Sequence, residues 1–167
     1  DFVVAFLDEY ALSQNTKRWV EKTAFDVFFL EKISDLLEDT VQYVGVVRHP
    51  LDVAISTAEF CDKAGLYPDA LRGFVQQSSS PLAAFIASWA VAFKNLKKLS
   101  ERYPANFVML RYEDMVQNPE ATSDGLYNFL GAEPPKERRK LGGTNVLGFS
   151  DHRTFEIPPF DVSRISR

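Results

Sequence analysis

The chain has 167 residues, and with 46% hydrophobic and 13% aromatic residues it can fill the core of a single domain, residues 1–167. The formal net charge of -4 argues against nucleic acid as a partner, because no overall basic field surrounds the chain. The single cysteine excludes an internal disulfide, no cysteine and histidine spacing suits a structural zinc ion, and no segment approaches the roughly 18 to 20 apolar residues of a membrane span.

The first half of the chain predicts helices and strands in alternation. Residues 2–12 and 25–37 carry apolar side chains at helical spacing. Between them, residues 18–21 predict a short strand. Residues 41–47 are rich in valine and form a continuous apolar run, which is typical of a buried parallel strand.

Two proline signals mark the helices that follow. Pro50 suits the first position of a helix that we expect over residues 51–64, because proline lacks the backbone N–H that this position leaves unpaired. Ser80 and Pro81 signal the start of a longer helix that ends near Arg102. Its apolar face includes Trp89, and we expect that face to pack in the core.

The last predicted elements complete the pattern. Residues 107–110 predict a strand, and residues 120–130 predict a helix that stops at Gly131, a typical C-terminal cap. Three apolar strands separated by helices predict an α/β fold, with helices covering both faces of a parallel sheet in three layers.

Charged residues follow all three predicted strands, in residues 21–23, 48–50 and 111–114. In folds of this class, ligands bind beyond the carboxyl ends of the strands. Two arginines, a lysine and several carboxylates at such an edge indicate a site for a polyanionic ligand together with a proton acceptor.

The same segments resemble the sulfotransferase family that uses 3′-phosphoadenosine 5′-phosphosulfate (PAPS), in the branch with a Glu-Lys-Thr sequence found in bacterial and Golgi-type members. The likeness runs from Arg18 to Gly131. It implies a sulfotransferase fold related to the P-loop NTPases, and transfer of a sulfuryl group from PAPS to a hydroxyl or amine. The motifs that carry it are Trp19-Val20-Glu21-Lys22-Thr23, residues 44–56, Arg111-Tyr112-Glu113-Asp114-Met115, Asn118-Pro119-Glu120 and Phe129-Leu130-Gly131.

The resemblance implies that Arg48 and Ser56 bind the 3′-phosphate of the donor and that Tyr112 lies near its nucleotide. Arginine suits this role because its planar fork of donors grips a phosphate in two places, and a serine hydroxyl adds a further hydrogen bond. The alternative reading is a surface ion pair at Arg48, an ordinary helical serine at Ser56, and a tyrosine that packs at the sheet edge.

Glu21 and Lys22 match the reaction centre of this branch. Sulfuryl transfer, like phosphoryl transfer, needs in-line positioning, a base for the acceptor proton and cations around the transferred group. The resemblance implies that Glu21 is the base and that Lys22 neutralises charge on the oxygen between sulfur and the nucleotide. The alternative is a solvated Glu-Lys pair.

Family members hold the 5′-phosphosulfate in a glycine-rich loop, and no such loop follows a predicted strand in this sequence. We therefore expect the chain to be part of a larger sulfotransferase domain. A nucleotide or nucleoside kinase of related fold is an alternative, although it requires a lysine-bearing phosphate loop. A non-catalytic nucleotide-binding module is another.

The remaining expectations concern the partners of the protein and its cellular location. PAPS is the expected co-substrate, 3′-phosphoadenosine 5′-phosphate (PAP) the product, and no metal is required. The acceptor is a small molecule, a carbohydrate or a lipid, with residues 65–80 and 142–159 as candidate acceptor loops. The lone cysteine favours the cytoplasm, with the Golgi lumen as the alternative if an anchor lies upstream.

Overall fold

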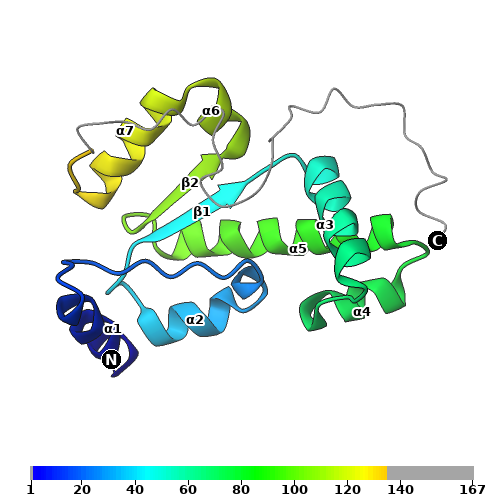
Figure 1. Ribbon diagram of the computed structural model, residues 1–167, viewed down its shortest axis with the longest axis horizontal. Coiled ribbons are helices and arrows are strands. Elements are labelled where there is room, and N and C mark those ends of the chain that lie inside the picture. Colours follow the sequence, from blue (N-terminus) through cyan, green and yellow to red (C-terminus); the bar gives the residue numbers. More distant parts are fainter. Residues whose placement is uncertain (1, 135–167) are drawn as a thin grey trace.

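The computed structural model describes residues 2–134, in which helices surround a two-stranded parallel sheet (Figure 1). Strand β1 (Tyr43–Val47) pairs with β2 (Phe107–Arg111), so that Tyr43 lies opposite Phe107 and Val47 opposite Arg111. The helices, in chain order, are α1 (Phe2–Ser13), the 3-10 turn η1 (Asp26–Phe28), α2 (Leu30–Leu37), α3 (Pro50–Ala64), α4 (Asp69–Gln77), α5 (Pro81–Arg102), α6 (Tyr112–Gln117) and α7 (Pro119–Leu130).

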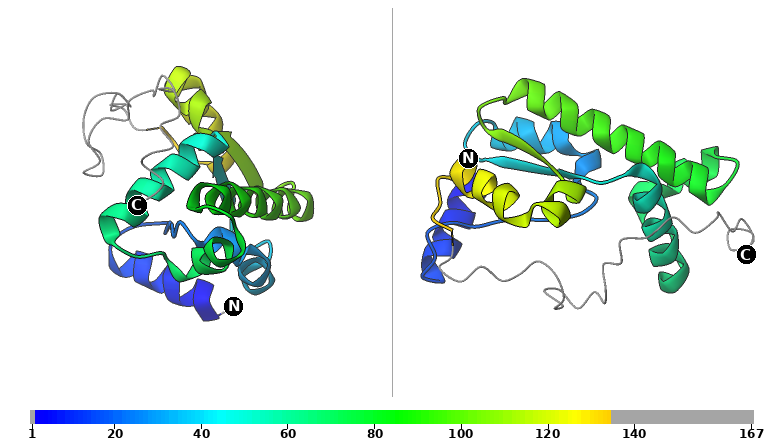
Figure 2. Two further views of the ribbon diagram at one scale, coloured as in Figure 1. Left: turned by 90° about the vertical axis from the view of Figure 1, so that its right-hand side faces the viewer. Right: turned by 90° about the horizontal axis from the view of Figure 1, so that it is seen from above.

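The sheet lies between two layers of helix, with the long α5 on one side and α6 and α7 on the other (Figures 1 and 2). Helices α3, α4 and α5 make the crossover that a parallel pair of strands requires. This arrangement is the α/β fold with helices flanking a parallel sheet that the sequence predicts. No helix within residues 2–134 is long and apolar enough to cross a membrane.

Helix α5 packs closely on β1 because Gly45 leaves room for it. A Cβ atom at this buried position would lie 2.8 Å from Cζ of Phe107 and 3.1 Å from Cδ2 of Leu96. Both distances are shorter than ordinary van der Waals contact. Gly45 therefore allows the Leu96 side chain of α5 and the Phe107 ring of β2 to lie against the backbone of β1.

A second apolar cluster joins α3, α4 and α5 beyond the carboxyl end of β1. Its buried members are Ala54, Cys61, Leu71 and Phe85. Leu71 is supplied by α4, which lies inside the segment 65–80 that we expected to be an acceptor loop. That expectation is wrong for residues 69–77, because they form a helix whose Leu71 packs against α3 and α5. The second candidate loop, residues 142–159, lies outside the described residues.

Two further expectations differ from the structure. Residues 18–21 have no regular secondary structure, because a strand needs a hydrogen-bonded neighbour and this segment pairs with neither β1 nor β2. Arg18 instead donates to the carbonyl oxygens of Leu130 and Gly131 at the end of α7. The helix expected over residues 25–37 is divided into η1 and α2.

The predicted helix ends are confirmed where capping chemistry specifies them. Pro50 begins α3, and the Ala83 N–H donates to Oγ of Ser80 at 3.2 Å, which caps α5. Gly131 ends α7 with φ of 59°, a left-handed conformation that glycine adopts without steric cost.

Candidate functional site

The candidate site is centred on Arg48, the first residue after β1. Since Val47 lies opposite Arg111 in the sheet, Arg48 and Tyr112 are the next residues of the two neighbouring strands. The guanidinium carbon of Arg48 lies 4.6 Å from the centroid of the Tyr112 ring, within the range of a cation–π interaction. The structure thus brings together two of the predicted donor-site residues.

The Nε atom of Arg48 is buried and makes no hydrogen bond to the described part of the chain. Its nearest acidic neighbour is Asp52, whose Oδ2 lies 3.4 Å away at ion-pair distance. This contact falls outside hydrogen-bond geometry, so the ion pair does not satisfy the donor. A buried donor without an acceptor costs about 1 to 3 kcal/mol, so this edge of the guanidinium favours a further acceptor.

Ser56 lies on α3, one helical turn beyond Asp52 and on the same face. Its side chain is exposed. The spacing of four residues corresponds to a rise of about 6 Å along the helix, and Arg48 reaches Asp52 from the helix start. Asp52 and Ser56 therefore share one face of α3, and Arg48, which precedes the helix, contacts the first of them.

The peptide group between Arg48 and His49 is bonded on both sides by side chains. The indole Nε1–H of Trp89 in α5 donates to the carbonyl oxygen of Arg48 at 3.0 Å. On the other side, the backbone N–H of His49 donates to Oε1 of Glu113 in α6 at 2.8 Å. The sequence motifs included Glu113, and Trp89 was assigned to the core, but neither role was predicted.

The Arg48–His49 turn also favours the ionised form of the Glu113 carboxylate. Burial raises its pKa, but hydrogen bonds from its own N–H and that of His49 outweigh this effect. The charges of Arg111 and Arg48 add to the lowering, with Nε of Arg111 at 4.0 Å from Oε2. The net result is a pKa below the ordinary glutamate value, so Glu113 is an anion that accepts the His49 N–H.

Glu21 and Lys22 lie in the irregular segment between α1 and η1, where both side chains are exposed. Glu21 accepts a hydrogen bond from Oγ1 of Thr23 at 2.5 Å. It also raises the pKa of Asp26: burial is the largest cause, followed by the charge of Glu21 and a hydrogen bond with it. The structure thus gives Glu21 local partners, whereas Arg48 is grouped with Tyr112 at the strand ends.

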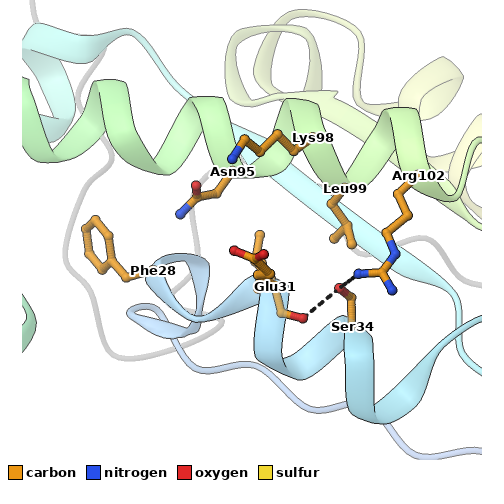
Figure 3. Close-up of a pocket in the computed structure, with 8 residues that line it drawn as sticks. Phe28, Glu31, Ser34, Asn95, Lys98, Leu99 and Arg102 are labelled. Atoms are coloured by element: carbon orange, nitrogen blue, oxygen red, sulfur yellow. Dashed lines mark hydrogen bonds between the residues drawn. The ribbon is translucent and has the colours of Figure 1, made fainter.

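A cavity of about 220 Å³ lies elsewhere, between α2 and α5 (Figure 3). Three of its polar side chains are hydrogen-bonded within the fold: Asn95 donates to the carbonyl oxygen of Val27, Ser34 to that of Glu31, and Arg102 to Ser34 and Asp35. The cavity lies beside the last turn of α5 and away from Arg48 and Tyr112, and we do not assign a ligand to it. Within residues 2–134, no three His, Cys, Asp or Glu side chains are grouped as metal ligands.

Comparison with known proteins finds similarity to sulfotransferases. A model of the sulfotransferase family matches residues 1–136. Sulfotransferase 1A1 of Mus musculus is 28% identical over 104 residues, which cover 61% of this chain and 35% of that protein. The enzyme of the same name from Canis lupus familiaris is 29% identical over 104 residues, with coverage of 61% and 34%. The chain thus spans about a third of the length of these curated relatives.

A solved structure shares the fold. The sulfotransferase domain from the curacin biosynthetic pathway aligns with a TM-score of 0.62 and 22% identity, over 80% of this chain and 44% of that one. This likeness concerns the fold. The family model covers residues 1–136, which is most of the chain, and this match shows that the chain belongs to the sulfotransferase family.

Proposed function

We propose that the protein transfers the sulfuryl group of PAPS to a hydroxyl or amine and releases PAP. Family membership supports sulfuryl transfer in general. The observation that carries the choice of donor is the buried, unsatisfied Nε of Arg48 at the end of β1. A phosphate provides the acceptors that this guanidinium lacks.

Arg48 and Ser56 are the proposed ligands of the 3′-phosphate. Arg48 is held above the Tyr112 ring at the start of α3, where the positive end of the helix dipole adds to its charge. The carboxylate of Asp52 lies 3.4 Å from Nε but leaves this donor without a hydrogen bond. A phosphate carries more charge than one carboxylate and can therefore compete with Asp52 for the guanidinium. Ser56 adds an exposed hydroxyl on the same helix face. Tyr112 is the proposed neighbour of the donor nucleotide.

Glu21 and Lys22 are the proposed reaction centre. Glu21 accepts the proton of the acceptor hydroxyl or amine as the acceptor atom forms its bond to sulfur. The bond between sulfur and the bridging oxygen breaks, and PAP leaves with the electron pair. Lys22 neutralises the charge that develops on that oxygen. The exposure of both residues is compatible with access to an acceptor, for which we propose a small molecule, a carbohydrate or a lipid. The reaction as written needs no metal.

The donor site is tested by calorimetric titration of the full-length protein with PAP and with ADP. We expect PAP to bind more tightly than ADP, and Arg48→Ala to weaken PAP by at least about tenfold, as for loss of a charged hydrogen bond. Arg72→Ala is the matched control, because Arg72 also pairs with an acidic residue on its own helix and is more exposed. Equal affinity for PAP and ADP would contradict the proposal and favour the kinase alternative.

The reaction centre is tested by transfer of radiolabelled sulfate from PAPS to a panel of phenols, sugars and amines. Glu21→Gln should lower the transfer rate by about 10²- to 10⁴-fold, the usual contribution of a general base, while PAP still binds. Glu59→Gln removes an exposed carboxylate on α3 and is expected to keep the wild-type rate. Full transfer by Glu21→Gln and by Lys22→Met would show that neither residue belongs to the reaction centre. Binding of PAP without transfer by any form of the protein would favour the non-catalytic nucleotide-binding module.

A further inference from the structure

The peptide group that joins Arg48 to His49 forms a hydrogen bond on each side with a side chain of a different helix. Trp89 of α5 donates to its carbonyl oxygen at 3.0 Å, and Glu113 of α6 accepts from its N–H at 2.8 Å. Because these two atoms belong to one rigid plane, the two bonds together fix the rotation of that plane. The rotation of the plane sets the backbone angles on either side of it, and one of them is at Arg48.

Both side chains are themselves held in place. The indole of Trp89 stacks on the ring of Phe93, with centroids 5.2 Å apart and planes 4° from parallel. Glu113 is anchored by its own backbone N–H and lies near Arg111. The two hydrogen bonds therefore connect the turn to the helix layers on both sides of the sheet, and not to flexible surface groups.

We infer that Trp89 and Glu113 are positioning residues for Arg48: by fixing the Arg48–His49 peptide, they set the direction in which the guanidinium leaves the end of β1. This inference rests on the proposed function, in which Arg48 binds the 3′-phosphate of PAP. It assigns to Trp89 a specific role beyond packing. The indole N–H matters to recognition of the 3′-phosphate, although Trp89 itself contacts the protein backbone and not the nucleotide.

The positioning role of Trp89 can be tested because it should affect only nucleotides that carry a 3′-phosphate. Trp89→Phe keeps an aromatic ring to stack on Phe93 and removes the N–H donor together with part of the ring volume. We expect PAP to bind about fivefold more weakly to this variant, the equivalent of one net hydrogen bond, and adenosine 5′-phosphate, which has no 3′-phosphate, to bind as before. In an Arg48→Ala background, Trp89→Phe should have no further effect on PAP. Packing alone would weaken both nucleotides, with or without Arg48.

Glu113 provides a second route to the same result if Trp89→Phe does not fold. Glu113→Gln and Glu113→Ala both remove the negative charge, but only glutamine keeps an acceptor for the His49 N–H. The difference between them therefore isolates the hydrogen bond from the charge. We expect the alanine variant to bind PAP about fivefold more weakly than the glutamine variant, with adenosine 5′-phosphate bound equally by both.

The closing experiment is a calorimetric titration of the full-length wild type, Arg48→Ala, Trp89→Phe, the double variant and the two Glu113 variants, each with PAP and with adenosine 5′-phosphate. The inference holds if Trp89→Phe and Glu113→Ala lose PAP affinity selectively and through Arg48. It is overturned if Arg48→Ala weakens PAP while Trp89→Phe, or the step from glutamine to alanine at Glu113, does not. If Arg48→Ala itself leaves PAP affinity unchanged, the assignment of the 3′-phosphate fails, and the positioning role fails with it.

Discussion

The guanidinium carbon of Arg48 lies 4.6 Å from the centroid of the Tyr112 ring, and this contact joins the ends of the two strands. It follows from the register, since the residues before them, Val47 and Arg111, are partners in the sheet. The Arg48 side chain is 25% exposed, so it reaches solvent although the Tyr112 ring lies against one face of the guanidinium. Tyr112 thus limits the directions from which Arg48 can bind an anion.

The first prediction concerns this contact. Replacing Tyr112 with leucine keeps an apolar side chain but removes the aromatic face, whereas Tyr112→Phe keeps the face. We expect PAP affinity to fall by about two- to tenfold further in the leucine variant than in the phenylalanine variant, which corresponds to a cation–π interaction of moderate strength. Calorimetric titration of both variants measures the difference. Equal affinities would mean that the ring does not help to position Arg48.

The second prediction concerns the space beneath α5. Gly45→Ala places a methyl group 2.8 Å from Cζ of Phe107, so the ring or the strand must shift. We expect the free energy of unfolding to fall by about 1 to 3 kcal/mol, the usual cost of overpacking a core. Urea denaturation followed by circular dichroism measures it.

Gly73→Ala is the control for this substitution. Gly73 is an exposed residue of α4, and a Cβ atom there meets nothing within 4 Å. The same chemical change should therefore stabilise the protein, by about 0.5 to 1 kcal/mol, because alanine favours the helix. If both alanine variants changed stability by the same amount and sign, the close approach at Gly45 would not be the cause.

Local signals allowed most of the fold to be predicted from the sequence. The valine-rich run specified β1, and Pro50, Ser80 and Gly131 specified helix ends, because each acts through its own backbone or that of a close neighbour. The strand expected at residues 18–21 failed because strand formation depends on a hydrogen-bonded partner. The amino-acid pattern of one segment does not contain that information.

The sequence identified candidate residues of the site but not the contacts that hold them in place. Arg48 and Tyr112 were expected to converge because both follow parallel strands, and the structure confirms that they meet. The hydrogen bond from Trp89 to Arg48 joins residues 41 positions apart and depends on where α5 crosses the turn. Helical periodicity places Trp89 on an inward face, but it does not reveal which carbonyl its N–H reaches.

A third prediction concerns the start of α5. Ser80 accepts the Ala83 N–H at 3.2 Å, which satisfies one of the unpaired donors at the helix start. Ser80→Ala should lower the free energy of unfolding by about 1 kcal/mol, and Ser80→Asp should restore most of it, since aspartate also caps helices. Ser79→Ala, at the exposed preceding residue, is expected to change stability little. A loss at Ser79 as large as that at Ser80 would contradict the capping role.

The fourth prediction concerns the dependence of stability on pH. The pKa of Glu113 is lowered in the folded protein: burial opposes ionisation, but two backbone N–H groups and the charges of Arg111 and Arg48 outweigh it. In the unfolded chain the pKa returns to the ordinary value of 4.5. The stabilisation from this carboxylate is therefore present above pH 4.5 and is lost as the pH falls below that value through the lowered pKa.

Glu113→Gln removes this proton linkage while it keeps an acceptor for the His49 N–H. The free energy of unfolding of the variant should therefore decline less steeply than that of the wild type as the pH falls below 4.5, where the carboxylate takes up its proton. Urea denaturation across that range measures both slopes, and Glu59→Gln, which alters an exposed glutamate of α3, is the matched control. Parallel acid slopes for Glu113→Gln and the wild type would mean that the carboxylate gains nothing from folding. The bond to the His49 N–H would then have to be about as strong with a neutral acceptor as with a charged one.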